Sequence, residues 1–431
     1  MPEATGLGAR APRPAEASSP DASGRTRPPP DSPRLVEVGW VLAGDLDPED
    51  RGAVDAACQA LLDRLRGWFP EFEWRMPVVP RRDVEVHQPA EPVLLLDHGI
   101  EERDLRRWDF ALVVTKVELR TYLQPFAFAI PARAVSCGVI STARLDPAAT
   151  RTDVAHERER SAVMGRRVEA LALHLLGHLT DLPHAEDPRD FMSDLETLGD
   201  IDQLDRLAPE ALAQMRAELE LVADLRLEET GPYRGRRPRG RALRFTCRAL
   251  LHNRGDVLRS LLRMRPWLMP LRLSRLTTAG ASALLVLIMT AEAWEVGMTE
   301  PPLRVVAASL VALAGTTAFI LQRQRLLLHT RAERLSEQRV VGNAAVSLAV
   351  LVGMATTYAL LFGLTLLLST TLYAPEVVAG WTPTLEGPPQ PGAYARLAGM
   401  VAALGITIGA LGASFEAQGY VRHVAYVDEE T

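Results

Sequence analysis

The sequence has few cysteines and almost no lysine. Its three cysteines, Cys58, Cys137 and Cys247, lie far apart and form no CxxC pair, which excludes a disulfide framework and a cysteine-rich zinc site. So few cysteines fit a reduced, cytosolic setting for the soluble part of the chain. Of the 48 basic residues only Lys116 is a lysine, which we attribute to genomic base composition rather than to function.

Two further features are missing. The formal net charge is −6 and no basic stripe with interleaved aromatic residues occurs, so we expect no nucleic-acid partner. No apolar h-region follows Met1, so we expect no signal peptide there. Residues 1–33 hold Pro, Ala, Ser, Gly and Arg with almost no large apolar residue, and we expect a disordered tail.

Residues 34–229 have the pattern of an α/β domain. Apolar runs typical of strands alternate with segments of helical period, an order that favours an α/β sandwich. We predict strands at 35–44, 72–80 and 108–119, a strand pair at 126–142, helices at 48–68, 152–179 and 209–227, a short apolar segment at 91–99, and irregular chain from 180 to 207.

Residues 230–275 are strongly basic. Thirteen arginines, from Arg234 to Arg275, accompany one acid, Asp256, directly before an apolar run. Such a juxtamembrane segment is attracted to anionic lipid headgroups. The alternative is a basic linker that binds nothing in particular, and the sequence does not separate the two.

The last part, 276–415, is predicted to be an all-α transmembrane bundle in a lipid bilayer. Loop 322–339 carries five arginines, whereas loops 295–304 and 373–396 carry one each. By the positive-inside rule, the soluble domain, loop 322–339, the tail 416–431 and both termini are cytoplasmic. Each of four apolar runs can cross a bilayer core, which needs roughly 20 residues, and they are 276–294, 305–321, 341–372 and 397–415.

The predicted spans carry few polar groups. None holds a central Asp, Glu, Lys, Arg or His, which disfavours a channel or transporter. In the last span Gly405, Gly409 and Ala413 recur every four residues, a pattern suited to close helix contact. This face serves packing within the bundle or a homo-oligomer equally well.

The candidate chemical site is HLLGHLTDLPH, residues 174–184. His174 and His178 are one helical turn apart, so both imidazoles lie on one face and can reach a common ion. His184 follows six residues later and can return as a third ligand. Three histidines with an open fourth position hold a catalytic zinc, so we predict Zn²⁺ at these residues. The alternative is that two buried helix histidines and an unrelated loop histidine happen to have this spacing and bind no metal.

This segment resembles the metzincin signature HExxHxxGxxH, and more narrowly the archaemetzincins, whose signature continues HCxxxxCVM. Here the continuation is His184, Ala185, four residues, Asp190, Phe191 and Met192, with every spacing kept.

The stretch 108–148 also looks like the strand region that precedes the active-site helix in archaemetzincins. The resemblance covers residues 35–228 and implies a metzincin-like (zincin) fold with a zinc site of three histidines. It also implies that Met192 is the methionine of a Met-turn, and that the cleft takes a peptide or protein ligand.

Several family positions differ in this sequence. The glutamate that takes a proton from zinc-bound water is replaced by Leu175, which cannot accept one. The turn glycine is Asp181, a residue type that tolerates left-handed backbone angles. Two cysteines that help to bind a second zinc correspond to Ala185 and Asp190, so we expect no second site.

Three functional hypotheses follow. The first is a membrane-anchored, degenerate metallopeptidase that binds zinc and acts as a binding or regulatory module. The second is an active zinc metallopeptidase whose general base has moved to Asp181, Glu186 or Asp187. The third is a structural or interaction protein of the membrane that binds no metal.

Overall fold

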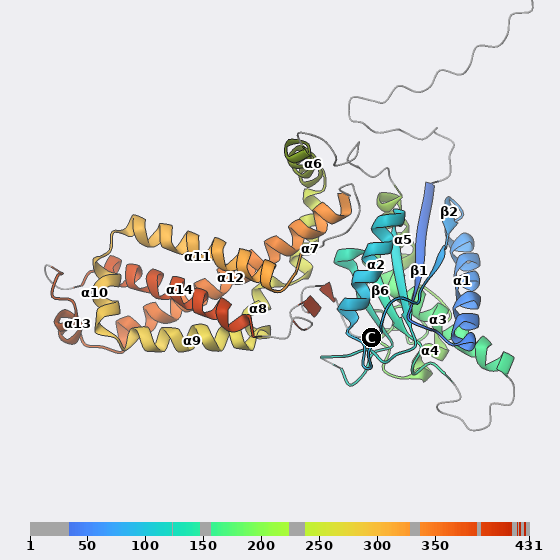
Figure 1. The fold of residues 1–431 in the computed structure, drawn as a ribbon, viewed down its shortest axis with the longest axis horizontal. Coiled ribbons are helices and arrows are strands. Elements are labelled where there is room, and N and C mark those ends of the chain that lie inside the picture. Colours follow the sequence, from blue (N-terminus) through green and yellow to red (C-terminus); the bar gives the residue numbers. More distant parts are fainter. Residues whose placement is uncertain are drawn as a thin grey trace, which may run out of the picture.

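The computed structural model describes residues 34–122, 124–146, 157–223, 238–327, 337–385 and 389–415, with a few residues between 420 and 427. A sheet-containing domain lies at one end, and long helices extend away from it (Figure 1). The tail predicted at 1–33, and residues 152–156 and 224–227 of two predicted helices, lie outside the described residues.

A six-stranded sheet forms the first part, in the order β2-β1-β4-β6-β5, with β3 also paired to β1. All pairs are parallel except β5–β6, which is antiparallel and leaves β5 at one edge. The strands are β1 (Arg34–Ala43), β2 (Phe72–Arg75), β3 (Val78–Arg81), β4 (Phe110–Thr115), β5 (Ala129–Ala132) and β6 (Cys137–Ser141). The helices of this part are α1 (Pro48–Trp68), α2 (Pro92–Arg106), η1 (Arg133–Val135), α3 (Glu157–Leu179), α4 (Leu198–Gln203) and α5 (Pro209–Val222).

Helices cover both faces of the sheet. In β1, Val38 and Trp40 belong to the core that α1 and α3 close, whereas Val41 and Ala43 belong to the core on the α2 side. Successive strand residues point to opposite faces, so a continuous apolar strand fills two cores. The strand β4 is buried along its whole length for the same reason.

Two predictions for this part are refined. The strand predicted at 72–80 is two short strands, because Pro77 lies between them and has no N–H to donate to β1. The apolar segment 91–99 is the first half of α2, which begins with Pro92 in its first turn and ends before Arg107, at φ 65°. The helix continues through a polar stretch, so apolar periodicity alone did not predict it.

The second part is helical. Three of its helices, Pro302–Arg323, Arg339–Thr371 and Pro391–Ala413, are long and apolar enough to cross a membrane, which indicates a membrane protein. The predicted span 276–294 falls on a shorter helix of 15 residues, Ser274–Ile288, and on the start of the next. A fourth span results only if Val257–Arg272 and Ser274–Ile288, bent by 54°, are taken together. The elements are α6 (Pro238–His252), α7 (Arg254–Arg263), η3 (Pro266–Leu268), α8 (Met269–Arg272), α9 (Ser274–Ile288), α10 (Ala291–Thr299), α11 (Pro302–Arg323), α12 (Glu337–Thr371), α13 (Pro375–Trp381) and α14 (Pro391–Ala413).

The glycine face of α14 packs against α9 of the same chain. A Cβ on Gly409 would lie 2.9 Å from the carbonyl oxygen of Leu276, and one on Gly405 would lie 3.5 Å from that of Gly280. Only residues without a side chain permit this approach of two backbones. Close packing within the chain is therefore one use of this face.

Ion pairs join the two parts. Arg339 of α12 lies 3.2 Å from Asp104 of α2, whose side chain is 1% exposed and also pairs with Arg103 at 2.7 Å. Near the C-terminus, Arg422 pairs with Asp97 of α2 at 2.5 Å. The helix that covers one face of the sheet is thus one of the elements that contact the helical part.

Candidate metal centre

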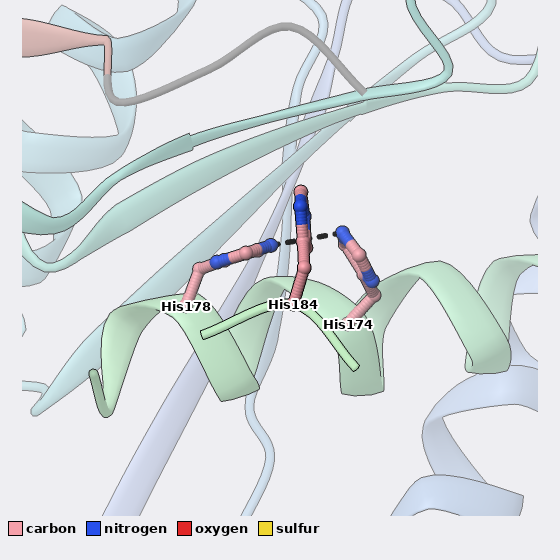
Figure 2. Close-up of side chains that lie close together, drawn as sticks. All are labelled: His174, His178 and His184. Atoms are coloured by element: carbon pink, nitrogen blue, oxygen red, sulfur yellow. Dashed lines mark hydrogen bonds between the residues drawn. The ribbon is translucent and has the colours of Figure 1, made fainter. Parts of the chain in front are cut away.

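Three histidines converge at the C-terminal end of α3. Each of His174, His178 and His184 offers one ring nitrogen, and these atoms all lie within 4.8 Å of one another. Figure 2 shows His174 and His178 on one face of the helix, with the ring of His184 between them. The Nε2 atoms of His174 and His178 are 2.9 Å apart. Two ligands of a tetrahedral zinc are separated by about 3.4 Å, so this arrangement fits one ion with little adjustment.

The turn after α3 brings the third histidine back. Asp181 has φ 73°, so this residue adopts the left-handed conformation that the turn requires. The side chain of Gln214 donates to the Asp181 carbonyl oxygen at 2.7 Å and holds the turn against α5. The chain then reverses and places His184 over the helix it has just left (Figure 2).

Two of the histidines are oriented by a second partner. His174 is fully buried, and its Nδ1 lies 2.7 Å from the carbonyl oxygen of Phe191, so Nδ1 carries the proton. The Nδ1 of His184 lies 2.5 Å from a carboxylate oxygen of Asp194. In both residues Nε2 is then left for the metal, which is the outer-shell arrangement of many zinc sites.

Neither partner was predicted from the sequence. Phe191 acts through its backbone, so its side chain gives no signal. Asp194 lies ten residues after its histidine, and that interval follows no helical or strand period. An acid shortly after the candidate Met-turn residue is the one hint that could have identified it.

Met192 lies in a tight turn beneath the helix. The N–H of Ser193 donates to the Asp190 carbonyl oxygen at 2.9 Å, and Ala185 donates to the Met192 carbonyl at 2.8 Å. A Cβ on Gly177 would lie 2.1 Å from the sulfur of Met192, so this glycine admits the methionine under the histidines.

Asp190 stabilises this turn. Its carboxylate accepts the backbone N–H groups of Met192 and Ala208, each at 2.8 Å. The side chain of Asp190 therefore serves as a hydrogen-bond acceptor for the backbone.

Leu175 points into the core, as its position in the apolar stripe of α3 predicts. It is fully buried, and a Cβ on Gly138 of β6 would lie 2.8 Å from its Cδ1. The side chain thus packs on the sheet at a residue that leaves room for it. No proton acceptor stands at this position.

Two of the three carboxylates considered as a relocated base are engaged in ion pairs. Asp181 pairs with Arg133 of η1, and Asp187 pairs with Arg206 at 2.6 Å. Hydrogen bonds from the Arg189 backbone and from Arg206 hold the pKa of Asp187 below its usual range. A carboxylate with a lowered pKa is a poor base near neutral pH. The third, Glu186, is exposed.

The donor set fits zinc. Neutral imidazoles are the commonest ligands of catalytic zinc, and the group supports a zinc site at His174, His178 and His184. Zinc bound there would supply a Lewis-acidic centre with one open position.

Comparison with known proteins gives the following. No protein-family model matches the chain, and no curated protein matches it. Similar solved structures include a zinc-dependent peptidase from Methanocorpusculum labreanum, with 17% identity over 41% of this chain and 99% of that one, at a TM-score of 0.31. The archaemetzincin of Methanopyrus kandleri has 18% identity over 43% of this chain and 97% of its own, at 0.30. That of Archaeoglobus fulgidus has 15% identity over 42% and 99%, at 0.28.

Proposed function

We propose that this chain is a membrane-anchored, metzincin-like zinc-binding protein without peptidase activity. Its soluble domain lies in the cytoplasm and uses the zinc site to bind a peptide or protein ligand, as a binding or regulatory module. The membrane helices keep this module at the bilayer surface.

One observation carries the proposal. The site keeps three convergent histidines, two of them oriented by Phe191 and Asp194. The position that needs a proton acceptor holds Leu175, fully buried against Gly138. Loss of a general base typically removes a factor of ~10²–10⁴ in rate.

Two of the three neighbouring carboxylates considered as a replacement base are already engaged in ion pairs. Asp181 is paired with Arg133 and Asp187 with Arg206, and hydrogen bonds from Arg189 and Arg206 hold the pKa of Asp187 below its usual range. Asp194 is paired with His184, where it orients a ligand. These contacts favour a site that binds without cleaving.

Two measurements on the purified full chain test the proposal. Metal analysis should find one zinc per chain, and cleavage of a mixed peptide library should be undetectable. The same peptide library is incubated with the His178→Ala variant, which is the metal-free control. Cleavage by the native chain that disappears in His178→Ala would establish the active-enzyme hypothesis instead. Absence of zinc from the native chain would leave the third hypothesis, a membrane protein that binds no metal.

A further inference from the structure

A groove lies where the basic segment meets α12. Its volume, counted together with the open solvent at its mouth, is about 350 Å³. Its walls include Met264 and Met269 on one side and Val346 and Val350 of α12 on the other. Arg265 and Arg272 line the same groove. It thus combines an apolar floor with two cationic groups, and it is separate from the histidine site.

The groove lies at the end of the candidate spans that faces the sheet domain. Val346 and Val350 follow Arg339, the first residue of a candidate span, by seven and eleven residues. At 1.5 Å per residue they lie about 10 and 16 Å along the helix. Arg339 itself pairs with Asp104 of the soluble domain. In Figure 1, α7 and α8 lie at this end of the long helices. The groove therefore lies near the end of a candidate span, where lipid headgroups would meet acyl chains.

The residues that line the groove include two arginines and no carboxylate. Both Arg265 and Arg272 are exposed, and within the described part of the chain neither guanidinium forms an ion pair with a carboxylate. Residues 230–275 contain thirteen arginines and one acid, so the surroundings add positive potential. Arg259, in contrast, pairs with Glu218 at 3.2 Å.

The surface around the groove is apolar as well as basic. Large side chains of α7, η3 and α8 point outward, with exposures of 53% for Leu258, 53% for Leu262, 44% for Trp267 and 78% for Leu271. Such exposure is unfavourable in water and favourable at a membrane interface, where tryptophan is enriched. This face therefore has the composition expected of a membrane interface.

We propose that the groove binds one anionic phospholipid from the leaflet next to the soluble domain. Arg265 and Arg272 bind the phosphate by charge-assisted hydrogen bonds, and an acyl chain lies along Val346 and Val350. The ligand is a lipid rather than a free anion, because the groove pairs its two arginines with apolar walls that a free phosphate does not contact. Basic pockets between membrane helices are known to suit such headgroups.

The test is native mass spectrometry of the full chain in a neutral detergent. Phosphatidylglycerol, phosphatidylcholine and inorganic phosphate are added separately, and the bound fraction is measured against concentration. The variants are Arg265→Gln with Arg272→Gln, and Arg254→Gln as an exposed arginine of the same segment outside the groove. All three positions are at the surface, so these changes leave the fold intact.

The native chain should bind one phosphatidylglycerol more tightly than phosphatidylcholine. The double variant should lose about tenfold or more in affinity for phosphatidylglycerol, since it removes two charge-assisted hydrogen bonds. Arg254→Gln should bind as the native chain does. Equal losses in both variants would mean diffuse attraction and overturn the proposal. Binding of inorganic phosphate as tight as that of phosphatidylglycerol would overturn the lipid assignment. None of these outcomes depends on zinc.

Discussion

His174 and Phe191 are joined by a hydrogen bond of 2.7 Å from the imidazole Nδ1 to the backbone carbonyl oxygen. The turn that holds Met192 therefore also sets the direction of the first histidine. Because Phe191 offers only an acceptor, the proton is on Nδ1 and the lone pair of Nε2 faces His178. The helix and the turn form a single structural unit around the site.

The first prediction concerns the metal. The full chain should bind one zinc, and His174→Ala, His178→Ala and His184→Ala should each lose it at micromolar free metal, because two imidazoles hold zinc weakly. Metal content after gel filtration is the measurement. Stoichiometric zinc in all three variants would place the metal elsewhere in the chain.

The second prediction concerns Asp194. Asp194→Asn removes the carboxylate that orients His184 and should weaken zinc binding by ~10–100-fold without unfolding the domain. Glu196→Gln, an exposed acid two residues away, is the matched control and should leave the affinity unchanged. Competition with a chelator of known affinity measures both. Equal affinities for Asp194→Asn and the native chain would show that the pairing does not support the site.

The third prediction concerns Leu175. Leu175→Glu buries a carboxylate against Gly138 and should destabilise the domain by about 3 kcal/mol. Leu175→Met conserves volume and should cost less than about 1.5 kcal/mol. Denaturant unfolding of the soluble domain, followed by tryptophan fluorescence in the full chain, compares them. If Leu175→Glu is as stable as the native chain and gains peptidase activity, the leucine stands within reach of zinc-bound water.

The fourth prediction concerns pH. Burial lowers the pKa of His98 below its usual 6.5, and Arg81 lowers it further, although the carboxylates of Glu101, Asp97 and Asp83 oppose the shift. Below pH 6.5 the unfolded chain then binds a proton that the folded chain does not. This contribution to stability is therefore complete above pH 6.5 and decreases as the pH falls toward the folded-state pKa.

The corresponding measurement is the thermal midpoint between pH 7.5 and 5.5. His98→Gln should show a smaller decrease than the native chain, because it lacks the group that titrates. His87→Gln, at an exposed histidine, should behave as the native chain does. If His98→Gln and the native chain decrease equally, His98 does not govern this window.

The fifth prediction concerns topology. In a chain whose three cysteines, Cys58, Cys137 and Cys247, are replaced by alanine, a single cysteine at Thr384 should react with an impermeant maleimide added to intact cells. A cysteine at Thr330, in the arginine-rich loop, should react only after lysis. The reverse pattern would invert the orientation and place the soluble domain outside.

Much of the local structure follows from the sequence alone. The helix Pro48–Trp68 has the predicted bounds, since a proline in its first turn and apolar residues at helical spacing are local signals. The apolar runs likewise predicted three helices long enough to span a membrane. The first run, 276–294, was predicted as a fourth span, but in the structure it is divided between α9, which ends at Ile288, and a second helix that begins at Ala291.

The sequence also determined which histidines could meet, because a spacing of four is set by helix geometry. Only the tertiary structure decided that Asp194 orients His184, that Arg133 forms an ion pair with Asp181, and that Leu175 packs on Gly138. These contacts join residues that are 10, 48 and 37 positions apart. No local period encodes such pairs, because they form only when the sheet and the turn after α3 fold against each other.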